Sequence, residues 1–187
     1  MNALENWFCS TSFWRKITRE QLLPWTLGSI NLGNHLLEIG AGAGAATAEL
    51  QKRVPHLTSL EYDHALTTRL AQTNRSGGRV VQGNAAALPF ANGTFTSAIA
   101  ILMLHHLRSS ELQDLAFREV QRVLQPAGCF CAFDIQDGWI NRVVHIKSTF
   151  VPIQPQTVAA RLKHAGFANI SVDSRSGAFR FRASKGN

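Results

Sequence analysis

The chain has 187 residues, of which 45% are hydrophobic and 17% are charged, so its composition is that of one globular domain and not of a disordered segment. Its net charge of +7 brings nucleic acid and anionic lipid into consideration, but Lys and Arg are scattered and form no long basic run. The three cysteines lack metal-ligand spacing, no apolar stretch is long enough to cross a bilayer, and no signal peptide is recognisable. We therefore expect a cytoplasmic protein with reduced cysteines.

Residues 2–25 are predicted to be helical, with basic side chains close to the tryptophans Trp7, Trp14 and Trp25. Three interpretations fit this segment: packing against the edge of a sheet, a lid over a ligand, and a helix lying on a membrane surface. The sequence leaves all three open.

A glycine-rich turn follows the short apolar run at residues 35–39, and an alanine-rich, helix-forming segment comes after it. This order predicts a buried parallel strand whose carboxyl end bends sharply into a helix. Gly40, Gly42 and Gly44 permit positive φ angles there and leave no Cβ to obstruct a ligand. The start of the helix offers backbone N–H groups to a polar or anionic group, so this turn is the predicted ligand site.

Four further strands are expected downstream, at residues 57–61, 79–83, 96–104 and 129–133. The helices between them begin at capping residues, Asp63 for one and Ser109 or Ser110 for another. The second of these is expected to end near Leu124, where the Pro-Ala-Gly sequence at 126–128 stops it. Strands that alternate with helices predict a doubly wound α/β layer, in which ligands bind at the carboxyl ends of the strands.

The last part of the chain departs from this alternation. A helix at about 156–165 leads to two short strands, at 168–173 and 178–182, which are close enough to form an antiparallel hairpin. Residues 179–182 alternate Phe with Arg, which predicts one buried face and one face in water.

Two cofactors compete for the glycine turn, because Gly40 to Ala45 also satisfies the dinucleotide pattern G-x-G-x-x-G/A. Glu61, at the end of the second strand, can hold the ribose hydroxyls of either cofactor. Glu38 precedes the glycines, where it can meet a cationic amino group but would repel a pyrophosphate. Asn84 follows the third strand and can pair with an adenine edge. With no room for a separate substrate domain, these features favour S-adenosylmethionine over a nicotinamide dinucleotide.

An ordered set of motifs runs through residues 36–134: Glu38–Gly44, Glu61–Asp63, Gly83–Ala85 with Leu88–Phe90, Phe95–Ile99, Leu104–Leu107 and Arg122–Gly128. As a set, these motifs resemble those of class I S-adenosylmethionine-dependent methyltransferases, most of all the ubiquinone/menaquinone-biosynthesis-like (methyltransferase type 11) group. The resemblance implies a doubly wound, Rossmann-like α/β fold. Its seven-stranded sheet would be mostly parallel, with an antiparallel last strand and helices on both faces.

The resemblance also implies which residues meet the methionine part of the cofactor. Gly40, Gly42 and Gly44 would line it, and Glu38 would lie near its amino group. Ile101, at the end of the fourth strand, would approach the cofactor mainly through its backbone.

On the adenosine side, the resemblance implies that Glu61 holds the ribose and that Tyr62 lies against the adenine. Asn84 would meet the adenine amino group, with Ala85 beside it. The family usually carries Asp at the position of Asn84, so the adenine contact is kept while a charge is lost. It also usually carries Asp where Thr96 stands, a position that we expect to be structural.

Methyl transfer is an in-line displacement at a sulfonium, and a general base helps when the attacking atom carries a proton. His105 and His106 follow the fourth strand, where acceptor and methyl group should meet, and are the candidate catalytic residues; the alternative is a structural role in which they form hydrogen bonds to the loop. His145 is a weaker candidate. Asp134 and Asp137 could orient a substrate or cap a turn, and no metal ligand is expected.

Apolar residues at helical spacing in the segment 139–150 are expected to form the acceptor pocket together with the N-terminal helix, although core packing would explain them too. Such a lining suggests a hydrophobic or aromatic acceptor. The Asn/Asp-Pro-Pro-aromatic motif of many amino-directed nucleic-acid methyltransferases is missing after the fourth strand, where Leu102 to His105 stand instead.

The sequence thus predicts a single methyltransferase domain over residues 1–187, with a helical lid or cap at 1–30, a cofactor-binding core at 35–135, and an acceptor-pocket segment with a C-terminal helix and hairpin at 136–187. The predicted reaction moves a methyl group from S-adenosylmethionine to a small, apolar or aromatic acceptor. The alternatives are an RNA or phospholipid-headgroup methyltransferase, a non-catalytic S-adenosylmethionine-binding protein and, last, a nicotinamide enzyme. Contact of the N-terminal helix with a membrane surface stays open, and the oligomeric state is not predicted.

Overall fold

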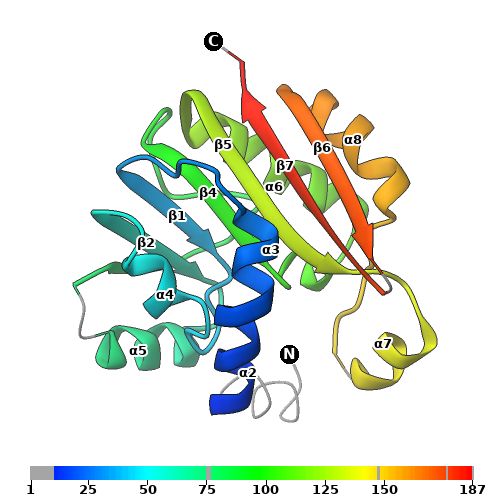
Figure 1. The fold of residues 1–187 in the computed structure, drawn as a ribbon, viewed down its shortest axis with the longest axis horizontal. Helices are drawn as coiled ribbons and strands as arrows, with labels where there is room; N and C mark the ends of the chain where they lie inside the picture. Colours follow the sequence, from blue (N-terminus) through cyan, green and yellow to red (C-terminus); the bar gives the residue numbers. More distant parts are fainter. Residues whose placement is uncertain (1–10, 75–76, 147, 176, 187) are drawn as a thin grey trace.

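Seven strands form one sheet in the order β3-β2-β1-β4-β5-β7-β6 (Figure 1). The computed structural model describes residues 11–74, 77–146, 148–175 and 177–186. The strands, in chain order, are β1 His35–Ile39, β2 His56–Glu61, β3 Arg79–Gln82, β4 Phe95–Ile101, β5 Leu124–Ile135, β6 Phe167–Arg175 and β7 Ala178–Lys185. Among these strands only β7 runs against its neighbours, β5 and β6, and the remaining pairs are parallel. The predicted sheet, mostly parallel with an antiparallel last strand, is confirmed.

Helices cover both faces of the sheet, with α3 in front and α6 and α8 behind in the view of Figure 1. They are α2 Ser12–Ile17, η1 Thr18–Leu22, α3 Leu23–Leu27, α4 Thr47–Gln51, α5 His64–Thr73, η2 Leu104–His106, α6 Ser110–Val123, α7 Trp139–Val144 and α8 Pro155–His164. The segment η1 is π-helical and η2 is a 3-10 turn. None of the described helices combines the length and the apolar character needed to cross a membrane.

The side chains of β1 enter two different hydrophobic clusters. Leu37 and Ile39 share one cluster with Phe117 of α6, whereas Leu36 shares the other with Leu23 of α3. Successive strand residues point to opposite faces, so both faces of β1 are covered by helices. This double coverage explains why β1 reads as an apolar run apart from Glu38.

Two predicted helix starts are confirmed by their capping hydrogen bonds. Asp63 accepts a hydrogen bond from Leu66 N at 3.0 Å and caps α5. Ser109 Oγ accepts one from Leu112 N at 3.3 Å and caps α6. Each side chain satisfies a backbone donor that the first helical turn leaves without an intrahelical partner.

Strand β4 is shorter than predicted. It ends at Ile101 because Leu102 adopts a φ of 53°, a left-handed conformation that cannot continue a strand. The chain then turns into η2, so His105 and His106 lie on a 3-10 turn beyond the sheet and not on the strand itself.

The start of β5 also differs from the prediction. The strand begins at Leu124, directly after α6, and the Pro-Ala-Gly sequence at 126–128 lies inside it. Ala127 has a φ of 59°, and the pairing with β4 shifts register between Phe95 and Ser97, so the Pro and Gly bend this strand locally. Helix α4, which follows the glycine turn, begins at Thr47.

The arginine face of β7 is not in water, contrary to the prediction. Arg182 Nε donates to Thr26 O at 2.8 Å, and the Arg180 guanidinium donates to Trp25 O and lies 5.3 Å from the centroid of the Trp25 ring. These long side chains satisfy carbonyls at the end of α3, which the helix itself leaves without partners. The arginines therefore fasten the N-terminal helices to the sheet.

Part of the predicted N-terminal helix lies outside the described residues, including Trp7 and Cys9. From Ser12 to Leu27 the chain is helical as expected. Cys131 is buried in the core and Cys129 is half-buried, and neither forms a disulfide.

Candidate functional site

Two adjoining cavities open at the carboxyl ends of β1, β2 and β4. The smaller, of about 230 Å³, is lined by Glu38 and three histidines, and we call it the histidine cavity. The larger, of about 470 Å³, is lined by Glu61 and the residues after β2 and β3, and we call it the Glu61 cavity. Gly40, Gly42 and His106 line both, so the two cavities meet at the glycine turn.

The three glycines of the turn do different things, although all have positive φ. A Cβ on Gly40 would lie 2.1 Å from Met103 Cγ, and one on Gly44 would lie 2.7 Å from Leu70 Cδ1. A Cβ on Gly42 would meet nothing within 4 Å, because Gly42 faces the cavities. Gly44 lines neither cavity, so its requirement is conformational.

Glu38 is a buried carboxylate on β1, with only 4% of its surface exposed. Its Oε2 accepts hydrogen bonds from Ser59 Oγ at 2.6 Å and from Thr47 Oγ1 at 2.8 Å. Burial raises the pKa of Glu38 to about 7, because desolvation outweighs the two hydroxyl donors. A cation placed beside it in the histidine cavity would stabilise the ionised form.

Glu61, on the neighbouring strand, is held by backbone groups. Its Oε2 accepts from Gly42 N at 2.8 Å, and its Oε1 accepts from Tyr62 N and Asp63 N at 2.9 Å each. A carboxylate offers about four lone-pair sites, so one is left for a ligand. Glu61 therefore braces the glycine turn against β2 as well as lining its cavity.

The other residues predicted on the adenosine side are brought together in the Glu61 cavity: Tyr62, Asn84 and Ala85. Tyr62 is exposed, and Ala85 is buried. Asn84 Oδ1 accepts from Ala86 N at 2.9 Å, which fixes the direction of its amide group. Thr96, expected to be structural, bonds to backbone groups of Leu32 and His35 and lines neither cavity.

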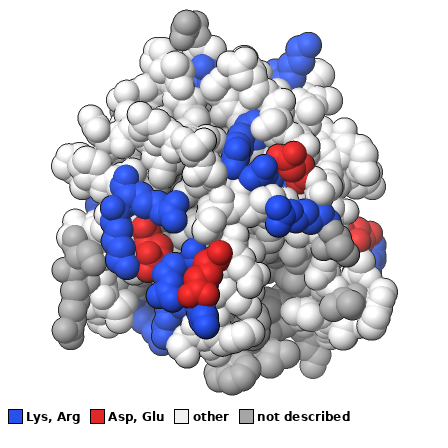
Figure 2. Space-filling view, viewed as in Figure 1, with Lys and Arg blue, Asp and Glu red and all other residues white. Residues whose placement is uncertain are grey.

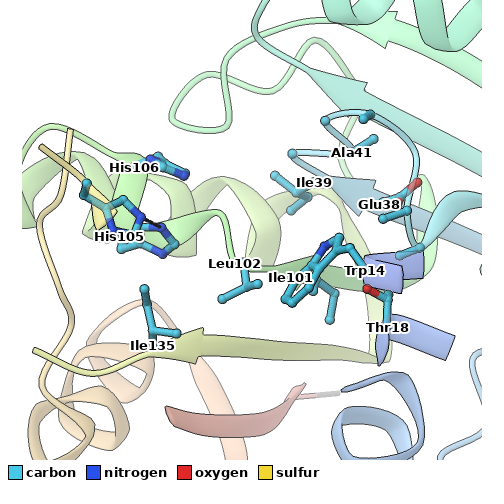
Figure 3. A pocket seen from close by; sticks show the side chains of 16 residues that line it. Trp14, Thr18, Glu38, Ile39, Ala41, Ile101, Leu102, His105, His106 and Ile135 are labelled. Atoms are coloured by element: carbon cyan, nitrogen blue, oxygen red, sulfur yellow. Dashed lines mark hydrogen bonds between the residues drawn. The ribbon is translucent and has the colours of Figure 1, made fainter. Parts of the chain in front are cut away.

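One end of the histidine cavity gathers the imidazoles of His105, His106 and His145, two of which Figure 3 labels. His105, only 2% exposed, has its Nδ1 2.5 Å from Asp134 Oδ1. Its backbone N–H also donates to the other oxygen of Asp134, at 3.2 Å. Asp134 thus holds His105 from two directions. Asp137 is exposed, pairs with Arg142 and lines neither cavity.

The opposite end of the histidine cavity is formed by Trp14, Thr18 and Glu38, with Ile101 and Leu102 between the two ends (Figure 3). Thr18 is only 1% exposed, and its Oγ1 has no hydrogen-bond partner among the described residues. A buried hydroxyl without a partner costs free energy unless a ligand supplies one. The sequence analysis missed Thr18, because neither the π-helical turn of η1 nor the lack of a partner can be read from a helical pattern.

The apolar segment at 139–150 does not form the predicted pocket wall. Trp139 is 76% exposed, and Val143 and Ile146 are also exposed. The apolar lining comes instead from Trp14, Ile101 and other residues at the strand ends.

Both the sequence and the fold of this chain are similar to those of known proteins. A family model described as a methyltransferase domain matches residues 37–132. An uncharacterized methyltransferase of Synechocystis sp. is 31% identical over 120 residues, which are 63% of this chain and 56% of that relative. The chain therefore spans little more than half the length of this relative.

Solved structures share the fold at low sequence identity. A chain of the complex that contains the Haloferax volcanii Trm112 methyltransferase activator matches with a TM-score of 0.77 and 13% identity, covering 100% of this chain and 99% of its own. Phosphoethanolamine N-methyltransferase 2 of Haemonchus contortus, in complex with S-adenosyl-L-methionine, matches with a TM-score of 0.72 and 12% identity. That match covers 88% of this chain and 51% of the other, and at such identities the likeness concerns the fold.

Proposed function

The chain belongs to the methyltransferase domain family, and from this premise we propose that it transfers a methyl group from S-adenosylmethionine to a small, apolar or aromatic acceptor. The observation that carries the proposal is a buried carboxylate, Glu38, that lies beside an open glycine turn where two cavities meet. Of the residues predicted for the cofactor, all except Gly44 line at least one of the two cavities.

The cofactor fits this cleft with its methionine end in the histidine cavity. The ammonium group of the methionine part would lie near Glu38, where it would offset the burial that raises the pKa of this carboxyl. The hydroxyl of Thr18, without a partner in the described residues, would bond to the same end of the cofactor. Gly42 has no side chain, which leaves room for the methionine part of the cofactor in this cleft.

The adenosine part would occupy the Glu61 cavity. Glu61 would use its last lone-pair site on the ribose hydroxyls, and Tyr62 would lie against the adenine. Asn84 would pair with the adenine amino group, with Ala85 beside it, and Ile101 would approach the cofactor from the end of β4.

This placement puts the transferable methyl group at the junction of the two cavities, so the acceptor would lie in the rest of the histidine cavity. That space is small and its middle is apolar, which favours a compact apolar or aromatic molecule. A lone pair of the acceptor forms the new bond to the methyl carbon, while the carbon–sulfur bond breaks and leaves its electron pair on sulfur. His105 and His106, the predicted catalytic residues, face this space, and we propose that the acceptor is activated at this histidine wall.

The helices α2 and η1 would act as the lid proposed for the N-terminal segment, because Trp14 and Thr18 line the cavity. Closing a site in this way excludes water from the reacting groups.

The rival substrates, RNA and a phospholipid headgroup, are motivated by the net charge of +7. On the face drawn in Figure 2, however, Lys and Arg are interspersed with Asp and Glu. Several Lys and Arg side chains of the described residues form ion pairs, such as Lys52 with Glu49 and Arg180 with Asp173. This mixed surface supports a small-molecule acceptor over a long polyanion.

The proposal is tested by incubating the protein with S-adenosylmethionine labelled in its methyl group and a fractionated metabolite extract. We expect labelled product in the apolar or aromatic small-molecule fraction. Label in RNA or in lipid headgroups would support the rival substrates. Tight cofactor binding without transfer to any fraction would favour a non-catalytic binding protein.

A further inference from the structure

Three histidines from two separate segments converge at the end of the histidine cavity. His105 and His106 lie on η2, and His145 follows α7, 40 residues after His105. One ring nitrogen of each histidine can be chosen so that all three atoms lie within 4.8 Å of one another. His105 and His145 are buried and His106 is half-buried, and all three line the cavity.

The hydrogen bonds of the Nδ1 atoms indicate which ring nitrogen of each histidine carries a proton. His145 Nδ1 lies 2.6 Å from the Asn141 carbonyl oxygen, and His106 Nδ1 lies 3.1 Å from the Thr149 carbonyl oxygen. A carbonyl can only accept, so both of these nitrogens carry a proton. His105 Nδ1 donates in the same way to the carboxylate of Asp134. In each neutral ring the lone pair is then on Nε2.

Two of these Nε2 atoms lie close to each other. His105 Nε2 and His145 Nε2 are 3.2 Å apart, so with both Nδ1 atoms protonated a cation, either a further proton or a metal ion, has to lie between them. A positive charge between the two nitrogens relieves their repulsion. Two nitrogens bound to one tetrahedral metal ion at about 2.0–2.1 Å would be roughly 3.3–3.4 Å apart, which is close to the observed spacing.

We propose that His105, His106 and His145 bind a divalent metal ion through their Nε2 atoms, with Zn²⁺ the favoured ion. Three neutral imidazoles with one open position form a common ligand set for catalytic zinc. Each Nδ1–H donates to a carboxylate or carbonyl oxygen, which is the arrangement that orients metal-bound histidines in other proteins. All three rings line the histidine cavity, so a fourth ligand would come from that cavity. The sequence analysis expected no metal, because His145 is too distant along the chain for a spacing motif.

The consequence for catalysis rests on the proposed function, whereas the metal site itself does not. An acceptor hydroxyl or thiol bound at the open position would lose its proton to water more readily, because the ion stabilises the resulting anion. That anion attacks the methyl carbon, and the carbon–sulfur electron pair stays on sulfur. A ring nitrogen that binds the ion cannot also accept the acceptor's proton, so the ion replaces His105 as the activating group.

The site is tested on tag-free protein that has been stripped with a chelator and then titrated with Zn²⁺ alone in a calorimeter. We expect one equivalent of Zn²⁺ to bind, with an affinity at least 100-fold weaker in His145→Ala. Asp134→Asn, which alters the partner of His105, should weaken binding by about 10- to 100-fold. His164→Ala removes an exposed histidine on α8 and should bind Zn²⁺ like the wild type.

Two further measurements keep the outcome clear. Co²⁺ in place of Zn²⁺ should give the visible absorption of a tetrahedral nitrogen site in the wild type and not in His145→Ala. Zn²⁺ should raise the melting temperature of the wild type but not that of the variant, which shows whether the variant is folded. Binding of less than one equivalent, or equal binding by His145→Ala, would overturn the proposal and leave His105 as a general base held by Asp134. Binding of S-adenosylhomocysteine, measured separately, reports on the proposed function and not on the metal.

Discussion

Each of the two cavities is built around one buried carboxylate, and the two carboxylates are held in opposite ways. Glu61 accepts three backbone N–H groups that belong to the glycine turn and the end of β2. Glu38 accepts only two side-chain hydroxyls, and its burial raises its pKa to about 7. Backbone donors thus hold Glu61 in place, whereas hydroxyl donors alone do not offset the burial of Glu38. We propose that Glu61 holds the glycine turn as well as binding the cofactor, and that Glu38 meets a cation of the ligand.

The largest expected effect concerns Glu38 in the ligand-free protein. Its pKa is about 7 when folded and 4.5 ordinarily, so the folded state holds this proton more tightly than the unfolded state. The resulting stabilisation is fully present below pH 4.5 and is lost as the pH rises through 7, a change of about 3 kcal/mol. Urea unfolding at a series of pH values should show this loss in the wild type and not in Glu38→Gln.

The raised pKa of Glu38 also provides a test of whether the cofactor ammonium group binds beside this carboxyl. A cofactor ammonium beside Glu38 would lower the pKa of this carboxyl, so binding of S-adenosylhomocysteine near pH 6 should release a proton. Calorimetry in buffers of different ionisation enthalpy measures this release. If Glu38→Gln releases as many protons as the wild type, Glu38 does not meet the ammonium group.

Glu61→Ala tests whether Glu61 holds the glycine turn and binds the cofactor. We expect the affinity for S-adenosylmethionine to fall by about 1.5–3 kcal/mol, because the variant loses charge-assisted bonds to the ribose and the glycine turn loses its anchor. Calorimetric titration measures the affinity, with Glu49→Ala as the control, since Glu49 is a surface residue paired with Lys52. Unchanged affinity in Glu61→Ala would remove Glu61 from the site.

Gly42→Ala, compared with Gly93→Ala, separates the effect of backbone strain from the effect of filling space that the ligand needs. Gly42 has a φ of 54° and Gly93 one of 64°, and a Cβ on either would meet nothing within 4 Å. Both alanine variants should therefore lose about 1–2 kcal/mol of unfolding free energy. Only Gly42 lines the cavities, so only Gly42→Ala should weaken the binding of S-adenosylhomocysteine. Equal affinity in the two variants would mean that the cofactor does not pass over Gly42.

The parts that the sequence predicted correctly are those set by local patterns. The capping residues Asp63 and Ser109, the βα alternation and the hairpin follow from neighbouring residues, and the ordered motifs led to the correct family. The ubiquinone/menaquinone-like subgroup stays a prediction. Glu38 and Glu61 line the cavities at the strand ends where the sequence placed them, and their roles toward the cofactor stay predictions.

The parts that the sequence could not give depend on packing between distant segments. The end of β4 is set by the left-handed conformation of Leu102, and nothing in the apolar run before it marks that residue. The arginines of β7 are covered because α3, more than 150 residues earlier, presents its last carbonyls to them. His145 reaches His105 only through the fold. No neighbouring residues in the sequence signal these three features, so alternation and spacing alone could not predict them.

The smallest expected effect is also the one in which stability and binding change in opposite directions. Thr18→Val keeps the shape of the side chain but removes a buried hydroxyl without a partner in the described residues, so the unfolding free energy should rise by about 1 kcal/mol. If that hydroxyl bonds to the methionine end of the cofactor, affinity for S-adenosylmethionine should fall about 3- to 10-fold. Thr26→Val is the matched control, because Thr26 is equally buried but donates to Leu22 O at 2.7 Å. It should lose stability and keep its affinity, since it lines neither cavity. A Thr18→Val protein that is more stable and binds the cofactor as tightly as the wild type would mean that the hydroxyl does not contact the cofactor.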